Sequence, residues 1–320
     1  MTLEKYNNIP VVWQLSALHL DKKTLLSGVI LRDTPFAYEK QIGNFKNLLR
    51  VCKSYFIGVY GNKIILITTN DKTINTNTDK YGSFTVVVDL LHKGDLTIKT
   101  ADNDKPLKIL QNYPIIFQNR KGLFDVISDI DDTIIVSYTA DFFKRIGALA
   151  FTPPQKRKAV DFTQKLLEEF EKHDTRVIYI SKSESNLFAM LTSFIKHNKL
   201  PTGNLILTPY LKFSQLFHPK KGHNYKLNNI RFILKNTGAK YFVLFGDDSQ
   251  KDMVVYSEIA KEFPERILKI YIRQTKRKIL PYQKMIWGQL ELSGTPIVYF
   301  NDNTNMDLQN EFNQLKNTIS

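Results

Sequence analysis

Three aspartates crowd residues 126–134 (VISDIDDTI), where Asp129, Asp131 and Asp132 follow an apolar run and precede a threonine. Carboxylates this close raise one another's pKa, so the cluster needs a compensating cation. If the chain turns directly after a strand, Asp129 and Asp131 can approach one centre. One carboxylate could then attack a phosphorus atom while the other handles the leaving group's proton. An acidic surface turn is the alternative explanation.

A second acidic segment, GDDSQKD at residues 246–252, follows the apolar run FVLF and precedes a helical pattern. Asp247, together with Asp248 or Asp252, could complete an oxygen cage with Asp129. Carboxylates that face an anionic substrate require a cation, and Mg²⁺ bound by carboxylates and substrate oxygens would supply it. Capping of the helix N-terminus is the alternative role for an aspartate here.

From about residue 120 the apolar pattern alternates between strands and helices. The expected strands are FDVIS, RVIYIS, NLILT, KYFVLFG and RILKIYIR, and the expected helices are VDFTQKLLEEFEKH, NLFAMLTSFIKHN, YKLNNIRFILKN and VVYSEIAKEF. Such alternation predicts βαβ units and a mostly parallel sheet, with ligands at the carboxyl ends of its strands. Four polar residues follow apolar strands and are therefore expected at one edge of the sheet: Asp129, Ser181, Asp247 and Arg273.

The first 110 residues are rich in short β-branched or apolar runs that alternate with turn residues. The expected strands are LLSGVILR, YFIGVY, KIILITT, GSFTVVVD and LTIKT, and the polar stretch before GSFTVVVD is expected to form a loop with a hairpin. Strands of this size and spacing predict a sandwich. We therefore divide the chain into an all-β, sandwich-like domain at residues 1–115 and an α/β domain at residues 116–320.

Two further polar side chains suit phosphoryl transfer, in which catalysis consists mainly of positioning and charge stabilisation. Ser181, between a strand and a helix, could donate its hydroxyl and nearby backbone N–H groups to phosphate oxygens, or it could simply cap the helix. Lys226 lies early in the helix before the GDDSQKD strand. It could supply a positive charge to the site or be one more exposed lysine.

In their order along the chain, the segments VISDIDDT, VIYIS, the lysine of YKLNNI and GDDSQKD resemble the four motifs of the haloacid dehalogenase superfamily of phosphohydrolases. The resemblance implies a Rossmann-like domain with a mostly parallel sheet and a small cap. It implies that Asp129 is the nucleophile and Asp131 the general acid/base. It also implies that Thr133 shapes the turn, Ser181 binds phosphate and Lys226 stabilises the phosphoaspartate.

The same resemblance implies a Mg²⁺ site. The carboxylates of Asp129, Asp247 and Asp252 would hold the ion directly or through water, together with the backbone carbonyl of Asp131. Asp132 falls at the variable position of the DxDxT motif, so we expect it to have a structural or supporting role.

A narrower resemblance covers about residues 120–275. SDIDDTI, YIS-x-S-xx-L, PTGNLIL, GD-xx-QKD-xxx-Y and FP-xx-I-xx-IYIR look like segments of the actin-patch phosphatidate phosphatase family and its bacterial relatives. This resemblance implies Mg²⁺-dependent hydrolysis of phosphatidate to diacylglycerol and phosphate. The chain departs from the family pattern within Lys182-Ser183-Glu184, where asparagine and proline usually flank the serine, and at Asp248, where serine is usual.

The composition, with 42% hydrophobic and 24% charged residues, is that of an ordinary globular protein. No apolar run is long enough to span a membrane, the N-terminus lacks a signal-peptide layout and Cys52 is the single cysteine. We therefore expect a cytoplasmic protein, peripheral at the membrane if its substrate is a lipid. Zinc spacings, helix-turn-helix patterns and RNP-like runs are lacking, so we expect no nucleic-acid partner.

The formal net charge of +14 is spread along the chain, with one local basic cluster at residues 266–278. That cluster is expected to be a solvated strand end or a surface for anions or lipid head groups. Residues 137–158 are expected to form a small lid, whose apolar side chains are either core or a surface that touches a lipid. These are Phe142, Phe143, Ile146, Leu149 and Phe151, and the basic residues nearby are Lys144, Arg145, Lys156, Arg157 and Lys158.

The sequence thus predicts a Mg²⁺-dependent phosphatase that acts on phosphatidate or a related lipid phosphate through an aspartyl-phosphate. The first alternative is the same site acting on a soluble phosphomonoester or a phosphoprotein. The second is a non-catalytic interaction protein, against which the complete set of motif residues argues. The oligomeric state does not follow from the sequence.

Overall fold

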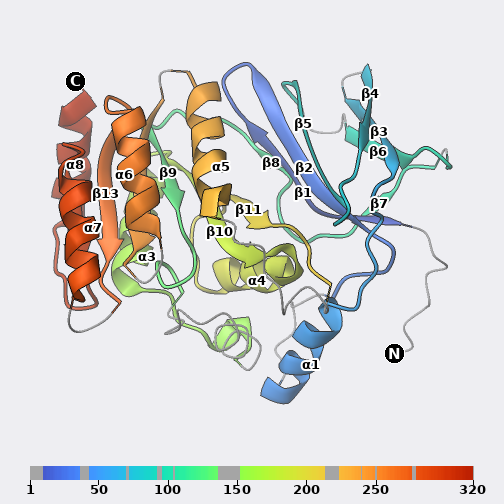
Figure 1. The fold of residues 1–320 in the computed structure, drawn as a ribbon, viewed down its shortest axis with the longest axis horizontal. Coiled ribbons are helices and arrows are strands. Elements are labelled where there is room, and N and C mark those ends of the chain that lie inside the picture. The colour runs from blue at the N-terminus through green and yellow to red at the C-terminus, as the bar shows by residue number, and fades with distance from the viewer. Residues whose placement is uncertain are drawn as a thin grey trace. The chain divides into compact units, whose positions relative to one another are not determined.

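The computed structural model describes residues 10–36, 43–69, 72–91, 96–103, 105–135, 152–212, 223–238, 240–248, 251–275 and 279–319. The chain divides into two compact units (Figure 1). The first unit comprises Met1–Asn119, Glu184–Ser193 and Leu207–Lys220, and the second comprises Arg120–Ser183, Phe194–Ile206 and Lys221–Ser320. The domain boundary between residues 115 and 116 stays a prediction.

Two β-sheets make up most of the first unit. The larger has the strand order β5-β2-β1-β7, with β8 also paired to β1, and the smaller has the order β4-β3-β6. The strands are β1 (Val11–His19), β2 (Lys23–Leu31), β3 (Ile64–Thr69), β4 (Lys72–Asn77), β5 (Ser83–Asp89), β6 (Leu96–Thr100), β7 (Lys108–Ile109) and β8 (Ile116–Phe117).

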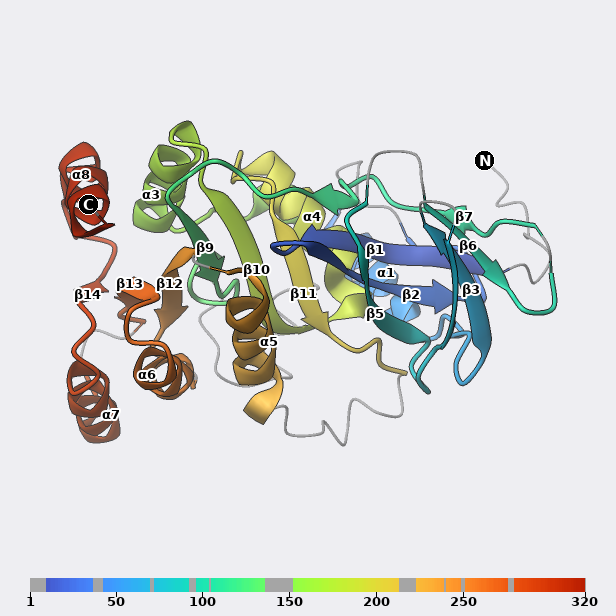
Figure 2. The ribbon, with the colours of Figure 1, turned by 90° about the horizontal axis from the view of Figure 1, so that it is seen from above.

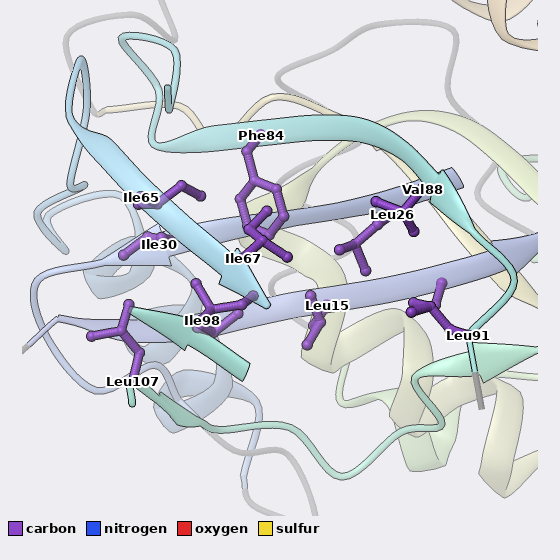
Figure 3. Close-up of a cluster of buried hydrophobic side chains, with 12 residues drawn as sticks. Leu15, Leu26, Ile30, Ile65, Ile67, Phe84, Val88, Leu91, Ile98 and Leu107 are labelled. Atoms are coloured by element: carbon purple, nitrogen blue, oxygen red, sulfur yellow. The ribbon is translucent and has the colours of Figure 1, made fainter. Parts of the chain in front are cut away.

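The two sheets share one hydrophobic core (Figure 3). Leu15 of β1 and Phe84 of β5, from the larger sheet, belong to the same buried cluster as Ile65 of β3 and Ile98 of β6, from the smaller sheet. The packing is close, because a Cβ at Gly28 would lie 2.8 Å from the ring of Phe84. Two sheets around one core form the sandwich-like arrangement that the sequence predicted.

A helix, α1 (Asn44–Ser54), interrupts this β-rich unit and was not predicted. Its buried side chains, Asn47, Val51 and Ser54, recur at helical spacing, but two of the three are polar. The predicted strand at residues 55–60 was wrong. The backbone N–H groups of Tyr55 and Phe56 donate to carbonyls in the last turn of α1, which directs the chain into a turn instead.

Two other strands of this unit extend the prediction. β1 was not among the expected strands, although it pairs with β2 over most of its length. The polar stretch before β5 contains β4, which pairs antiparallel with β3 and so forms the expected hairpin. Its side chains are mostly exposed or half-buried, which explains why the segment resembled a loop in sequence.

The second unit is built on a six-stranded sheet with the order β11-β10-β9-β12-β13-β14. β9 pairs in parallel with β10 and β12, β12 with β13, and β13 with β14. The strands are β9 (Phe124–Ser128), β10 (Arg176–Glu184), β11 (Asn204–Thr208), β12 (Tyr241–Asp247), β13 (Ile267–Arg273) and β14 (Ile297–Phe300). The parallel sheet confirms the predicted α/β fold class.

Helices cover both faces of this sheet: α3 and α8 lie on one face, and α5, α6 and α7 lie on the other (Figure 2). The helices after α1 are α3 (Asp161–Lys172), α4 (Phe188–His197), α5 (His223–Asn236), α6 (Asp252–Glu262), α7 (Pro281–Glu291) and α8 (Leu308–Ile319), with 3₁₀ turns η1 (Pro154–Lys156) and η2 (Ser185–Leu187). The last three elements, α7, β14 and α8, extend the predicted pattern.

The predicted lid lies largely outside the described residues. Its apolar side chains at Phe142, Phe143, Ile146, Leu149 and Phe151 belong to the segment 136–151, which the structure does not describe. Within the described parts of the chain, no helix is long and apolar enough to cross a membrane.

The basic cluster at residues 266–278 does not form one surface in its described part. Arg266 donates to the Lys240 carbonyl oxygen at 2.7 Å, and Lys269 pairs with Glu311 at 2.6 Å. Arg273 is buried and donates to backbone and side-chain oxygens of its own unit. These three cations therefore stabilise the fold, and Lys276, Arg277 and Lys278 lie outside the described residues.

A buried ion pair joins β9 to β10 near the amino ends of these strands. Arg176 Nε donates to Asp125 Oδ2 at 3.0 Å, and both side chains are almost completely buried. The Lys240 ammonium group lies 3.7 Å from the other oxygen of Asp125. The pair fixes two strands at the end opposite to Asp129, which follows β9, and to Ser181, which lies in the second half of β10.

We predict that Arg176→Met will destabilise the protein by about 3–5 kcal/mol, because it leaves the Asp125 carboxylate buried without its main partner. Urea unfolding measures the change. Lys165→Ala, which breaks the exposed pair between Lys165 and Asp161 at 2.8 Å, is the control. The control should change stability by less than about 1 kcal/mol. Equal effects of the two substitutions would contradict a special role for the buried pair.

Candidate active site

The carboxyl end of β9 places Asp129 in the middle of the sheet. Ser128 is in register with Tyr179 of β10 on one side and with Phe245 of β12 on the other. The Asp129 N–H donates to the Phe245 carbonyl at 2.9 Å, and the side chain is completely buried. A carboxylate therefore stands between two neighbouring strands at the edge predicted to bind ligands.

The chain turns directly after Asp129, as the spacing of the aspartates predicted. The N–H groups of Ile134 and Ile135 donate to the Ile130 carbonyl at 2.9 and 3.0 Å, which closes a tight turn. Thr133 Oγ1 donates to Asp129 Oδ2 at 3.3 Å within this turn. Thr133 therefore lies in the turn and contacts the first aspartate, and its role in shaping the turn stays a prediction.

Asp132 has the structural role expected for it. Its φ of +58° lies in the left-handed region, which aspartate tolerates better than most side chains. Its carbonyl accepts a hydrogen bond from Arg273 Nη1 at 2.8 Å. The carboxyl end of β13 thus holds the turn that presents Asp129 and Asp131.

A fully buried lysine lies between two of the carboxylates. Lys226 of α5 donates from Nζ to Asp129 Oδ1 and to Asp252 Oδ1, each at 2.6 Å. Burial by itself lowers the pKa of Lys226, but the charges of Asp129 and Asp252 outweigh it and hold the pKa well above the ordinary value. Lys226 is therefore not one more exposed lysine, which was the alternative left by the sequence. Its ammonium group remains positively charged.

One lysine does not neutralise this cluster. Burial raises the pKa of Asp129 to about 7, Lys226 opposes the shift, and the like charges of Asp252 and Asp131 add to it. An additional cation beside these carboxylates would favour their ionised forms.

Three carboxylates converge where such a cation could bind. Oxygens of Asp129, Asp247 and Asp252 lie within 4.8 Å of one another, and all three side chains are buried. Asp252 Oδ2 has no hydrogen-bond partner among the described residues, as expected for an atom that faces a ligand site. Carboxylate oxygens are the ligands that Mg²⁺ and Ca²⁺ prefer, so the donor set fits the implied ion. The Asp131 carbonyl as a further ligand stays a prediction.

The glycine before Asp247 allows this convergence. A Cβ on Gly246 would lie 2.9 Å from both the Cβ and the Oδ2 of Asp252, and 2.6 Å from the ring of Tyr256. The Tyr256 hydroxyl donates to the Phe245 carbonyl at 2.7 Å. Glycine at this position therefore lets the first turn of α6 pack directly against the end of β12.

Asp248 is not part of the carboxylate cluster. Its Oδ1 accepts hydrogen bonds from the Thr275 N–H at 2.9 Å and from Thr275 Oγ1 at 2.6 Å, and its Oδ2 accepts one from the Tyr299 hydroxyl. Its carbonyl oxygen accepts one from Gln283 Nε2 at 2.8 Å. Of the two alternatives for completing the oxygen cage, the structure therefore favours Asp252.

Two serines hold the carboxylate of Asp131. Ser181 Oγ and Ser183 Oγ donate to Asp131 Oδ2 at 2.9 and 2.8 Å, and both serines are completely buried. The sequence identified Ser181 as a phosphate ligand or a helix cap, whereas Ser183 was noted only within the segment YIS-x-S-xx-L and was given no role of its own. Binding of phosphate by Ser181 stays a prediction.

Two basic side chains near the cluster were not identified as site residues in the sequence. Burial lowers the pKa of Lys182, and the charges of Asp252, Asp129 and Asp247 act in the opposite direction. Burial likewise lowers the pKa of Arg157 to about 10, opposed by the charge of Asp131. The charges of the acidic cluster therefore act on both cations. In the sequence, the position of Lys182 between the two serines was the feature that could have identified it as a site residue.

Comparison with known proteins agrees with these motifs. Residues 124–274 match the family model described as phosphatidate phosphatase APP1, catalytic domain. Phosphatidate phosphatase APP1 of Saccharomyces cerevisiae is 29% identical over 204 residues, which cover 61% of this chain and 34% of that protein. An uncharacterized protein of Schizosaccharomyces pombe is 25% identical over 206 residues, which cover 63% of this chain and 32% of that protein. The match confirms the resemblance of residues 120–275 to the actin-patch phosphatidate phosphatase family.

The chain spans about a third of the length of these curated relatives. Among solved structures, the class C acid phosphatase from Bacillus anthracis with tungstate bound aligns at 13% identity with a TM-score of 0.30. The alignment covers 59% of this chain and 82% of that chain. A likeness at this level carries no argument, and the fold class rests on the strand order itself.

We predict that Mg²⁺ will raise the melting temperature of the protein, because an ion held by the three converging carboxylates would bind the folded state and not the unfolded one. At a concentration of about 100 times Kd the stabilisation is about 2.7 kcal/mol. Asp247→Asn should lose most of this shift, since it removes one of the three converging carboxylates. Differential scanning calorimetry with Mg²⁺ and with a chelator measures both values.

Asp248→Asn is the matched control, because it makes the same chemical change one residue away. It should lower the melting temperature with and without Mg²⁺, and it should keep the Mg²⁺-dependent shift. A shift in Asp247→Asn equal to that of the wild type would contradict the metal site.

Proposed function

We propose that this protein hydrolyses phosphatidate, or a closely related lipid phosphate, to diacylglycerol and phosphate, since residues 124–274 match the family model of the phosphatidate phosphatase APP1 catalytic domain. The observation that carries the proposal is the buried contact of Lys226 with Asp129 and Asp252, beside a third carboxylate at Asp247. Burying three carboxylates around one lysine does not by itself favour folding. Binding of a cation and a phosphate group would explain why these charges are buried together.

In the first step of the proposed reaction, a carboxylate oxygen of Asp129 attacks the phosphorus atom. The bond between phosphorus and the glycerol oxygen breaks, and Asp131 gives its proton to that oxygen, which leaves as the hydroxyl of diacylglycerol. The turn closed by Ile130 supports these roles, because it presents two carboxylates from positions two residues apart.

In the second step a water molecule attacks the phosphorus of the aspartyl-phosphate. Asp131, now ionised, accepts a proton from the water, and the bond between phosphorus and Asp129 breaks to release phosphate and the original carboxylate. The same residue thus serves as acid and then as base. Lys226, which contacts Asp129 Oδ1, would stabilise the charge of the phosphoaspartate.

The ion implied for this site is Mg²⁺, which we propose is held by Asp129, Asp247 and Asp252 with the Asp131 carbonyl. When bound, it would neutralise charge on the transferring phosphoryl group. With Asp131 protonated, as the first step requires, the carboxylates of Asp129, Asp247 and Asp252 are balanced by the three cations Lys226, Lys182 and Arg157. A divalent ion would then add two positive charges, which suits a dianionic phosphomonoester.

The same chemistry would act on a soluble phosphomonoester or a phosphoprotein, which is the alternative substrate class. The lipid substrate is favoured by the family match over the catalytic domain. A protein that acts on phosphatidate must reach a lipid surface, so we propose a cytoplasmic protein with transient contact to an anionic membrane. A purely non-catalytic interaction protein would have no need for the complete set of buried charges.

We predict that Asp129→Asn will reduce the turnover of phosphatidate in mixed micelles at least about a thousandfold, because the amide cannot act as the nucleophile. The overall fold should remain, since the change keeps the size of the side chain, and circular dichroism tests this. Asp161→Asn, the same change at an exposed position of α3, is the control and should retain wild-type rates.

Wild-type-like turnover in Asp129→Asn would overturn the assignment of the nucleophile. The substrate class is tested in the same assays by comparing phosphatidate with soluble phosphate esters. If soluble esters are hydrolysed far better and the protein does not bind phosphatidate vesicles, the soluble alternative replaces the lipid one.

A further inference from the structure

We infer that Ser183 is a positioning residue that orients the Asp131 carboxyl group for proton transfer to the leaving group. The inference rests on the proposed function and adds a residue that the reaction scheme above does not use. Ser183 Oγ lies 2.8 Å from Asp131 Oδ2, and both side chains are buried. The serine acts on the reaction through its contact with Asp131.

The direction of the hydrogen bonds follows from the donors present. The Ser183 backbone N–H donates to Ser181 Oγ at 2.9 Å, so the Ser181 hydroxyl hydrogen is left to donate to Asp131 Oδ2. The hydroxyl of Ser183 donates to the same oxygen. Asp131 Oδ2 therefore accepts two hydroxyl hydrogen bonds and acts as the acceptor atom of the carboxyl group.

This arrangement distinguishes the two oxygens of Asp131. A proton on Oδ2 would require one hydroxyl to turn away from its acceptor in a buried setting, which is unfavourable. The proton that Asp131 donates is therefore carried on Oδ1. Two hydrogen bonds to Oδ2, from different positions on β10, also fix the rotation of the carboxyl group and so the direction of Oδ1.

The geometry of β10 explains why both serines can do this. The strand continues through Glu184, so Ser181 and Ser183 lie two residues apart on the same face. Each hydroxyl reaches the residue that lies just beyond the end of the neighbouring strand β9. Ser185, two residues further, donates instead to the Thr208 carbonyl at 2.9 Å and provides a matched control.

The test compares two leaving groups. An alkoxide such as that of diacylglycerol needs a proton from the acid as it departs, whereas p-nitrophenolate departs readily without one. Because the second step is common to both esters, the rate to compare is kcat/KM, which reports the first step alone. Ser183→Ala is expected to lower kcat/KM for dioctanoyl phosphatidate about tenfold and kcat/KM for p-nitrophenyl phosphate less than about twofold. Asp131→Asn should show the same selectivity with a larger factor, and Ser183→Thr should restore both rates.

Ser185→Ala is expected to leave the ratio of the two rates at its wild-type value, because its hydroxyl does not contact Asp131. If Ser183→Ala fails to fold, Ser183→Cys retains the side-chain size with a weaker donor, and it should show the same selective loss. Circular dichroism and the melting temperature identify folded variants.

An equal loss of kcat/KM for both esters in the Ser183 variants would overturn the inference, because it would indicate a structural role only. No loss of either rate would overturn it as well. These outcomes leave the proposed function standing as long as the wild type hydrolyses the esters. A wild-type protein that is inactive on both esters would overturn the proposed function, and this inference with it.

Discussion

The contact of one buried ammonium group with two carboxylates is the interaction on which the site depends. Lys226 Nζ lies 2.6 Å from both Asp129 Oδ1 and Asp252 Oδ1. These groups come from three separate elements: Asp129 directly follows β9, Lys226 lies in the first turn of α5, and Asp252 is the first residue of α6. The charges can offset one another only if all three elements are in place, so the fold and the site are specified together. The carboxylate of Asp247 adds charge that a cation would balance.

The rest of the second unit holds the ends of its central strands in position. Asp247 and Asp248 are neighbours in sequence, but their side chains have different partners. Asp247 belongs to the buried carboxylate cluster, whereas Asp248 accepts hydrogen bonds from Thr275 and Tyr299 and so ties the end of β12 to the segments after β13 and within β14. Arg273 acts in the same way on the turn after β9, through the Asp132 carbonyl. Fixed strand ends keep the reacting groups preorganised.

Much of this arrangement could be predicted from the sequence. Apolar runs of strand length predicted the parallel sheet, and the polar residues that follow them predicted its ligand-binding edge. Asp129 and Asp247 were therefore expected to lie close together. The contact between Ser183 and Asp131 could not be predicted, because the expected strand ended at Ser181 whereas β10 continues to Glu184. Contacts across strands also decided that Asp252, rather than Asp248, joins the cluster. Helix α1 escaped prediction because its buried side chains are partly polar.

The central claim, that Asp129 forms the covalent intermediate, is tested most directly by trapping it. Asp131→Asn is mixed with p-nitrophenyl phosphate and Mg²⁺, quenched in acid within the first turnover and digested for mass spectrometry. A good leaving group permits the first step without an acid, while loss of the base slows the second. We expect one phosphoryl group on the peptide that contains Asp129, and on that aspartate. An unmodified peptide, or a phosphoryl group on Ser181 or Ser183 instead, would contradict it.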